Sequence, residues 1–297
     1  MGASATGSGA AYYAGSAGSA LFQAMKGIVQ DRLRRIEGKH NALVKELRGA
    51  FSRGEMTSSG SCAIEGMRIV EEAIRSGLRL EAVFFSEAAE SKAERLLPQI
   101  GSHVETLLLP DRLFASAVPS DSPQGVAALV RVKEHSLEDI MRRAQSGILI
   151  GVVGIQDPGN LGTIFRSAEA FSAGGVLLGE NTVNPFNSKV VRGSAGSLFR
   201  LPFTRTKIAE VLEPLRKAGV TLLATSSHKG TPLPEIDLRK PAAIFIGSEG
   251  SGLPRDLTST MDEMVVIPHA AQVESLNAGM AASIVLYEAA RQRSQSI

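Results

Sequence analysis

Residues 244–254 read IFIGSEGSGLP, and residues 265–268 (VVIP) and 274–277 (ESLN) follow soon after with a similar pattern of apolar and polar residues. In each case a short apolar run ends at small or polar residues, which is typical of a fully buried strand in a mostly parallel sheet. The residues after such a strand lie at its carboxyl end, where open α/β sheets bind ligands. The two stretches therefore predict one pocket that is built mainly from the backbone of two loops.

The composition is that of a globular protein. The chain has 297 residues, 43% of them hydrophobic and 21% charged, which is enough for two domains with separate cores. Its net charge is only +2, so binding of nucleic acid would depend on local basic patches. Cys62 is the only cysteine, which excludes an internal disulfide and a cysteine-based zinc site. No run is long enough for a membrane span, so we expect a cytoplasmic protein without membrane or metal partners.

The N-terminal part begins with a segment of low complexity. Residues 1–28 are rich in Ala, Gly and Ser over most of their length, and we expect a disordered tail there. Residues 29–53 carry seven basic against three acidic residues, and a helical apolar stripe leaves Lys45 and Arg48 facing outward. A solvated helix face and a nucleic-acid contact both explain this pattern.

Beyond this basic segment the pattern alternates between strands and helices. Glu65-Gly66 leads into a helix, and the pattern predicts a compact βαβ-type domain over residues 29–133. Residues 134–146, polar with apolar residues at helical spacing, are expected to form a linking helix. The further elements predicted for this domain are strands at 82–85, 104–108 and 126–132, a helix at 87–97 and a short helix after Pro110.

Residues 147–297 form the second predicted domain. A strand at 148–153 leads to a helix with Asn160 as its N-cap and an apolar stripe from Leu161 to Phe171. Further strands are expected at 175–178, 220–224, 242–246 and 264–267. A helix over 276–292 is expected to point Leu276, Met280, Ile284 and Tyr287 inward. This alternation predicts an α/β fold with a parallel sheet that is covered on both faces.

Three features of this domain could carry chemistry. Arg166 lies opposite the apolar stripe of its helix, where a guanidinium suits a phosphate or carboxylate. The glycines of 247–252 allow close approach of the backbone, and the polar residues of 274–277 precede a helix. Each feature also has an ordinary explanation: a surface arginine, a turn, and a helix cap by Ser275. Their occurrence together, at the strand ends of one sheet, favours a functional site.

These stretches resemble a known family. NLGTIFR (160–166), IFIGSEGSGLP (244–254) and VVIPHAAQVESLNAGMAASIVLYEA (265–289), in this order, resemble the three motifs of the SpoU (TrmH-like) RNA 2′-O-methyltransferases. Residues 185–202 also fit this family. AIEGMRIVEEAI (63–74) and SPQGVAALV (122–130) resemble its RNA-binding domain. The resemblance covers about residues 29–293.

The resemblance implies transfer of a methyl group from S-adenosyl-L-methionine to a ribose 2′-OH, with ribosomal RNA favoured over tRNA. It also implies a homodimer and a C-terminal trefoil knot around 247–277, which is a rare exception to the rule against knotted chains. Carried over position by position, the cofactor-binding residues are Thr225, Gly247, Glu249, Gly250, Ile267 and Leu276. The catalytic positions are Arg166, Asn160, Glu249, Ser275 and Asn277. The RNA-binding positions are Arg35, Lys39, Lys45, Lys189, Arg192, Ser194 and Arg200.

The role that we predict for Arg166 follows from its chemistry. A guanidinium stays protonated in proteins, so Arg166 is a poor base. We expect it to hold an RNA phosphate and to stabilise the developing alkoxide, with Asn160 and Asn277 orienting it.

The sequence departs from the family pattern at a few positions. His269 stands where Met is usual and Ala271 where Gly is common, and Ala278-Gly279 replaces a more usual Val-Ser pair. Ala271 would strain a turn with positive φ, and His269 is expected to be structural.

Two alternatives remain open. One is a non-catalytic RNA-binding or ribosome-assembly protein that keeps the knot. The other is a nucleotide-dependent oxidoreductase, but the acidic residue expected about 20 positions beyond its Gly-rich turn is missing.

Overall fold

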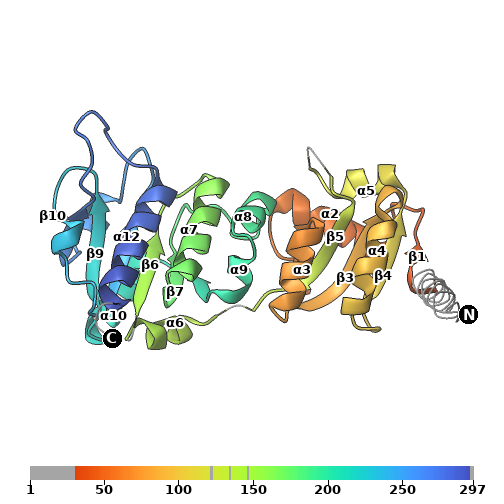
Figure 1. Cartoon of the computed structure of the whole chain (residues 1–297), viewed down its shortest axis with the longest axis horizontal. Coiled ribbons are helices and arrows are strands. Elements are labelled where there is room, and N and C mark those ends of the chain that lie inside the picture. The colour runs from red at the N-terminus through yellow and green to blue at the C-terminus, as the bar shows by residue number, and fades with distance from the viewer. Residues whose placement is uncertain (1–30, 121–122, 134, 146, 295–297) are drawn as a thin grey trace, which may run out of the picture.

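The structure is a computed structural model that describes residues 31–120, 123–133, 135–145 and 147–294. The predicted N-terminal tail, residues 1–28, lies outside the described residues. Two sheets lie side by side along the long axis of the molecule, with the short helices α8 (Ser188–Gly193) and α9 (Ser197–Arg200) between them (Figure 1). No described helix combines the length and the apolar character that crossing a membrane requires.

The N-terminal sheet has five strands in the order β1-β4-β3-β5-β2. Strands β1, β4 and β3 pair in parallel, whereas β5 pairs antiparallel with both β3 and β2. The three strands predicted in this part are present, with ends shifted by a few residues at most. The elements are β1 (Arg34–Arg35), α2 (Ala42–Arg53), β2 (Ser61–Glu65), α3 (Met67–Arg75), β3 (Arg79–Ser86), η1 (Glu87–Ala89), α4 (Ser91–Leu96), η2 (Leu97–Gln99), β4 (Glu105–Leu109), α5 (Asp111–Ala117) and β5 (Val126–Arg131).

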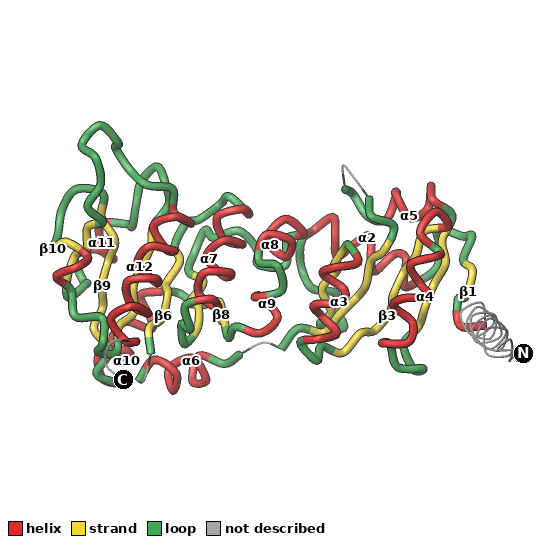
Figure 2. The backbone as a smooth tube through the Cα atoms, viewed as in Figure 1, coloured by secondary structure: helices red, strands yellow, loops and turns green. Residues whose placement is uncertain are grey.

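The C-terminal sheet has seven strands in the order β10-β12-β9-β11-β6-β7-β8, and every neighbouring pair is parallel. Helices and strands alternate along this part of the chain (Figure 2). Besides α8 and α9, its elements are α6 (Leu137–Ala144), β6 (Ile148–Val152), α7 (Pro158–Ala170), β7 (Gly175–Leu178), β8 (Phe203–Arg205), α10 (Ile208–Lys217), β9 (Thr221–Ser226), β10 (Thr231–Pro232), η3 (Leu233–Glu235), β11 (Ala242–Ile246), α11 (Arg255–Thr258), β12 (Glu263–Val266) and α12 (Ala278–Ser294).

The central strands of this sheet explain why it is parallel and covered on both faces. All residues of β6 and β11 are buried, as expected of strands between two layers of helices. Gly151 on β6 leaves room for an aromatic ring, because a Cβ there would lie 2.2 Å from Cδ1 of Phe245. The prediction of an α/β fold with a mostly parallel sheet is confirmed. The knot stays a prediction.

Three local predictions were wrong. Asp157, rather than Asn160, caps α7, because its carboxylate accepts the backbone N–H groups of Gly159 and Asn160 at 3.3 and 3.1 Å. Pro158 then occupies the first helical position, where the missing N–H costs nothing. The helix predicted at 87–97 is divided into η1, α4 and η2, and Pro98 lies in the last of these. Ala271 does not have a positive φ, so the strain that we expected there is absent.

The orientation of α12 was also predicted wrongly, although Leu276, just before the helix, is half-buried against the core as expected. Met280, Ile284 and Tyr287 are 56%, 37% and 55% exposed and do not point into the core. Small residues of α12 face α7 instead, because a Cβ on Gly279 would lie only 3.2 Å from Cβ of Thr163. Close packing of two helices needs small side chains at the contact, which places the large apolar residues of α12 on its outer face.

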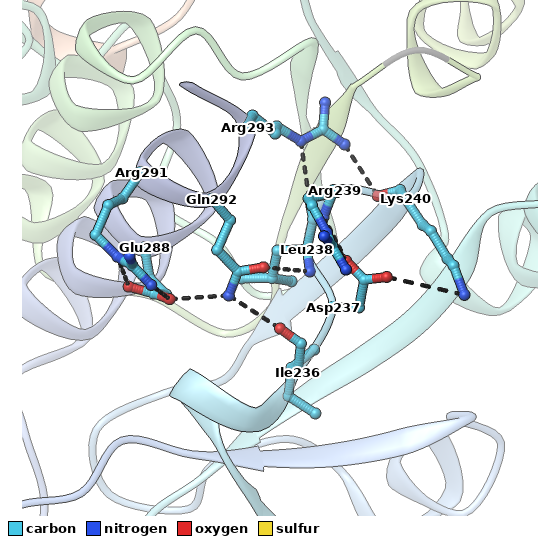
Figure 3. Close-up of polar contacts among 9 residues, drawn as sticks. All are labelled: Ile236, Asp237, Leu238, Arg239, Lys240, Glu288, Arg291, Gln292 and Arg293. Atoms are coloured by element: carbon cyan, nitrogen blue, oxygen red, sulfur yellow. Dashed lines mark hydrogen bonds and ion pairs between the residues drawn. The ribbon is translucent and has the colours of Figure 1, made fainter. Parts of the chain in front are cut away.

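The C-terminal end of α12 is fixed to residues 236–240, as Figure 3 shows. The amide of Gln292 accepts the N–H of Leu238 at 2.9 Å and donates to the carbonyl of Ile236 at 3.0 Å. The guanidinium of Arg293 donates to the carbonyls of Leu238 and Lys240 at 2.8 and 2.9 Å. Side chains of the last helical turns thus satisfy the backbone of the segment that leads into β11.

Candidate active site

A pocket of about 770 Å³ lies at the carboxyl ends of β9, β11 and β12. Three loops form its wall: residues 227–229 after β9, residues 247–254 after β11, and residues 267–277 between β12 and α12. This is the edge of a parallel sheet where ligands are expected to bind. All the residues predicted to bind the cofactor line this pocket, namely Thr225, Gly247, Glu249, Gly250, Ile267 and Leu276. The structure therefore brings the predicted cofactor-binding residues together.

The loop after β11 folds back on itself. Ser248 and Gly252 exchange both backbone hydrogen bonds, at 3.2 and 2.9 Å, and Gly252 has a φ of +66°. A Cβ on Gly247 would lie 2.1 Å from the carbonyl carbon of Gly252, so only glycine fits at position 247. The predicted need for a close backbone approach is met at this point. Pro254 precedes only the short helix α11, so no long phosphate-binding helix follows the glycines.

The loop after β12 is held by His269 and by the cap of α12. The two ring nitrogens of His269 lie 2.7 and 3.1 Å from the carbonyl oxygens of Ile267 and Val273. The side-chain oxygen of Asn277 accepts the N–H of Met280 at 3.1 Å, so Asn277, and not Ser275, caps the helix. Ser275 lines the pocket instead.

One side-chain contact joins the pocket to α7. Asn160, which is only 7% exposed, donates from its amide to the carboxylate of Glu249. The first and second predicted motifs therefore meet through their polar side chains. Asn160 donates to Glu249 and Asn277 caps α12. Among the described residues neither side chain forms a hydrogen bond with Arg166, contrary to our expectation that both would orient it.

Arg166 lies outside the pocket lining. It is exposed on α7, six residues beyond Asn160, which corresponds to about 9 Å along a helix axis at roughly 1.5 Å per residue. Its guanidinium forms no hydrogen bond or ion pair within the described part of the chain. A charged group that is exposed and unpaired in this position is available to a ligand from outside.

The residues predicted to bind RNA fall into three groups: exposed basic residues, one buried serine, and two arginines between the sheets. Lys39, Lys45 and Lys189 are exposed and form no ion pair with another described residue, whereas Arg35 pairs with Glu87 at 3.2 Å. Ser194 is fully buried and donates to the carbonyl of Val191, so it presents no surface to RNA in this conformation.

Arg192 and Arg200 form the third group. Both are engaged by carboxylates between the two sheets, Arg192 by Glu65 and Arg200 by Glu72 and Glu169. These two arginines connect parts of the protein and do not form a free basic surface.

Further pocket residues were not predicted. They include polar and basic side chains on the side formed by the loop after β9 and by α11, namely Ser226, Ser227, His228, Lys229, Arg255 and Thr258. The rings of His228 and His269 lie 6.3 Å apart between centroids. Residues 227–229 directly follow the carboxyl end of β9, and this position is the signal that could have identified them.

Comparison with known proteins agrees with the division into two sheets. A model of the SpoU rRNA Methylase family matches residues 147–287, and a model described as MRM3-like substrate binding domain matches residues 41–128. The 23S rRNA (guanosine(2553)-2′-O)-methyltransferase RlmP of Bacillus subtilis is 31% identical over 256 residues, which cover 86% of this chain and 98% of that protein. A 23S rRNA (uridine(2479)-2′-O)-methyltransferase of Streptomyces viridochromogenes is 31% identical over 82% of this chain and 86% of its own length.

Solved structures are similar over most of the chain. An rRNA methyltransferase from Sinorhizobium meliloti gives a TM-score of 0.76 at 27% identity and covers 88% of this chain and 98% of that chain. The SpoU methyltransferase AviRb from Streptomyces viridochromogenes, in complex with the cofactor AdoMet, gives 0.74 at 29% identity, with coverage of 86% and 99%.

The glycine loop supports a test by substitution. Gly247→Ala should weaken binding of S-adenosylmethionine by about tenfold or more, because relieving an overpacked contact costs about 1–3 kcal/mol. Gly38→Ala, outside the pocket, is the matched control, since Gly38 does not have a positive φ and a Cβ there would have no atom within 4 Å. Isothermal titration calorimetry measures both. Equal affinities in the two variants would mean that the approach of Gly247 to Gly252 does not shape the binding site.

Proposed function

The chain belongs to the SpoU rRNA methylase family, and we propose that it transfers the methyl group of S-adenosylmethionine to a ribose 2′-OH of ribosomal RNA. The observation that carries this proposal is the pocket at the ends of β9, β11 and β12, where all the predicted cofactor residues meet and Asn160 links them to α7. The names of two similar proteins state that they methylate 23S rRNA, and we propose an RNA of this class as the target.

The pocket fits S-adenosylmethionine. Its volume of about 770 Å³ lies within the range of roughly 300–1,000 Å³ that is usual for ligand sites. Backbone groups of 247–252 would hold polar edges of the ligand, while Ile246, Ile267, Leu276 and Ala278 supply apolar surface. When bound, this cofactor supplies an electrophilic methyl group. The protein must therefore mainly position a weak nucleophile against it.

Arg166 is proposed to hold the RNA. A protonated guanidinium binds a phosphate in a fixed geometry and stabilises negative charge on an oxygen that is losing its proton. Its exposure and its lack of a protein partner among the described residues support this role. A neutral guanidine is not accessible in a protein, so we do not assign Arg166 as the base.

Asn160 and Glu249 are proposed to act as a pair. By donating to Glu249, Asn160 fixes a carboxylate at the rim of the pocket, between the cofactor loop and α7. Glu249 would then accept a hydrogen bond from a ribose hydroxyl and orient the 2′-OH. Asn277 would act mainly through the start of α12, because its side chain caps that helix, and Ser275 lies beside it in the pocket wall.

The N-terminal unit is proposed to recognise the RNA. We propose residues 29–133 as the RNA-binding domain, 134–146 as the linker and 147–297 as the methyltransferase domain. The family models at 41–128 and 147–287 support this division. Lys39 and Lys45 are exposed and would contact phosphates there, with Lys189 on the second domain. A protein that modifies ribosomal RNA would work in the cytoplasm of a bacterium.

A homodimer is the proposed assembly. Met280, Ile284 and Tyr287 form an exposed apolar stripe on α12, and Tyr287 packs edge-on against Phe171 at 5.8 Å between ring centroids. An exposed stripe of large apolar side chains is costly in a monomer and typical of an interface. The proposed knot would involve the loops at 247–254 and 267–277, which line one pocket.

Comparing 2′-O-methylation of total RNA from strains with and without this gene tests the function. We expect one or a few ribosomal nucleotides to lose their methyl group in the deletion strain, and the purified protein to restore it with S-adenosylmethionine. A changed site in tRNA would make the assignment to ribosomal RNA wrong, and an unchanged profile in all RNAs would contradict the enzyme.

Substitution of Arg166 tests its proposed role. Arg166→Ala should lower the rate of methyl transfer by about 100-fold or more, as loss of an oxyanion-stabilising group does, while the affinity for S-adenosylmethionine stays within about twofold. Arg142→Ala, on an exposed arginine whose ion pairs stay within α6, should leave both unchanged. Equal loss of cofactor binding and transfer in Arg166→Ala would show that Arg166 is structural.

The proposed dimer is tested by placing a charge in the stripe. Ile284→Glu should convert the protein from a dimer to a monomer in sedimentation-velocity experiments, because a buried unpaired carboxylate is strongly unfavourable. Ala209→Glu, which adds the same charge to the exposed face of α10, should remain dimeric. A wild-type protein that sediments as a monomer would contradict the assembly.

A further inference from the structure

Two sets of ion pairs connect the two sheets. On the N-terminal side they involve β2 and α3, and on the C-terminal side they involve α8 and α9, which lie between α7 and α3 in Figure 1. In the first set, Arg192 of α8 donates to Glu65 of β2 at 3.2 Å. The Glu65 side chain is only 3% exposed, so removing Arg192 would leave a buried carboxylate without its charged partner.

The second set is centred on Arg200, the last residue of α9. Its guanidinium donates to both carboxylate oxygens of Glu169, to Glu72 at 3.1 Å and to the hydroxyl of Ser76 at 3.1 Å. We call these four residues the arginine bridge. Glu169 lies on α7, whereas Glu72 lies on α3 and Ser76 directly follows that helix. One planar side chain thus joins α3, which belongs to the N-terminal unit (residues 29–133), to α7, which belongs to the C-terminal unit (residues 147–297).

The two ends of the arginine bridge lie beside functionally distinct surfaces. Glu169 follows Arg166 by three residues on α7, so both project from neighbouring turns of one helix. Glu72 belongs to the unit that matches the substrate-binding model. A shift of Glu72 relative to Glu169 would therefore move the RNA-binding surface relative to Arg166.

The surroundings of the arginine bridge hold it in place. Gly196 caps α9 with a φ of +93°, and a Cβ there would lie 3.0 Å from Cβ of Glu72, so α9 and α3 approach closely. The bidentate hydrogen bond with Arg200 holds the pKa of the Glu169 carboxyl below its ordinary value. Glu169 in turn raises the pKa of Arg200, with a smaller contribution from Glu72. Arg200 therefore stays charged and paired.

We propose that Arg200 is a positioning residue, which fixes the distance and angle between the RNA-binding unit and the helix that carries Arg166. This proposal rests on the proposed methyltransferase function. The arginine bridge would act on the rate of transfer, because a ribose held by one unit must meet the cofactor pocket of the other. A misplacement of about 1 Å can lower a rate by about 100-fold.

A direct contact between Arg200 and RNA is the competing explanation. Nearly all the N–H groups of its guanidinium already donate to protein acceptors, which leaves little for a phosphate. The competing role would require RNA to displace Glu72 or Glu169. It predicts that removing either carboxylate strengthens RNA binding.

Glu72→Gln is the decisive variant, because it weakens the contact of Arg200 with α3 while the charge of Arg200 remains. We expect Glu72→Gln and Arg200→Gln each to lower kcat by between about 10- and 100-fold on the intact RNA substrate. The affinities for RNA and for S-adenosylmethionine, measured separately, should stay within about twofold. The double variant should be no slower than the slower single variant, because both changes break one bridge.

Arg75→Gln is the matched control. Arg75 also pairs with Glu72, at 2.6 Å, but that ion pair stays within α3, so kcat should be unchanged. The proposal is overturned if Arg200→Gln keeps the wild-type kcat, if Glu72→Gln tightens RNA binding, or if the fall in kcat is matched by an equal fall in RNA affinity. Lack of transfer by the wild-type protein would instead contradict the proposed function, so the two failures are distinguishable.

Discussion

The pocket depends on the approach of two backbone segments at Gly247 and Gly252. A side chain at position 247 would overlap the carbonyl carbon of Gly252, so the loop can close only because no side chain is present. That closure turns the loop after β11 back over the strand ends, where it meets the loop after β12. The polar contact of Glu249 with Asn160 follows from it, since the carboxylate is carried to α7 by the closed loop.

Much of the fold could be predicted because the central strands are continuous apolar runs. β6 and β11 are buried on both faces, so their sequences contain almost nothing but apolar residues and glycine. The strands that were missed are short or polar. β1 is Arg34–Arg35, β8 is Phe203–Arg205 and β10 is Thr231–Pro232, while β2 begins with Ser61 and ends with Glu65. Their pairing depends on partners far along the chain, which a local pattern does not reveal.

The site was predicted in part for similar reasons. The loops that line the pocket follow buried strands and could be located from the sequence. The individual cofactor residues were predicted only from the resemblance to the SpoU family, and the contacts of charged side chains could not be predicted. Arg192 and Arg200 look like any basic residues in sequence. Only the packing of α8 and α9 against β2 and α3 gives Arg192 its partner Glu65 and Arg200 its partner Glu72. On α12, a sequence that is apolar on several faces does not show which face is buried. The close approach of Gly279 to Thr163 decides that small residues face α7.

The hydrogen bonds at the end of α12 restrict how the pocket can exchange its contents. Gln292 and Arg293 fix the last turns of this helix to residues 236–240, and Asn277 caps its first turn. Releasing a spent cofactor by moving the helix away would break the hydrogen bonds of Gln292 and Arg293 with residues 236–240 together, each with a net worth of about 0.5–1.5 kcal/mol. We therefore expect the pocket to open by a motion of the loops that line it, among them residues 268–276, which are mostly exposed and without regular secondary structure. On this expectation, exchange of the cofactor would leave α12 and the sheet in place and would change only the conformation of the loops at the strand ends.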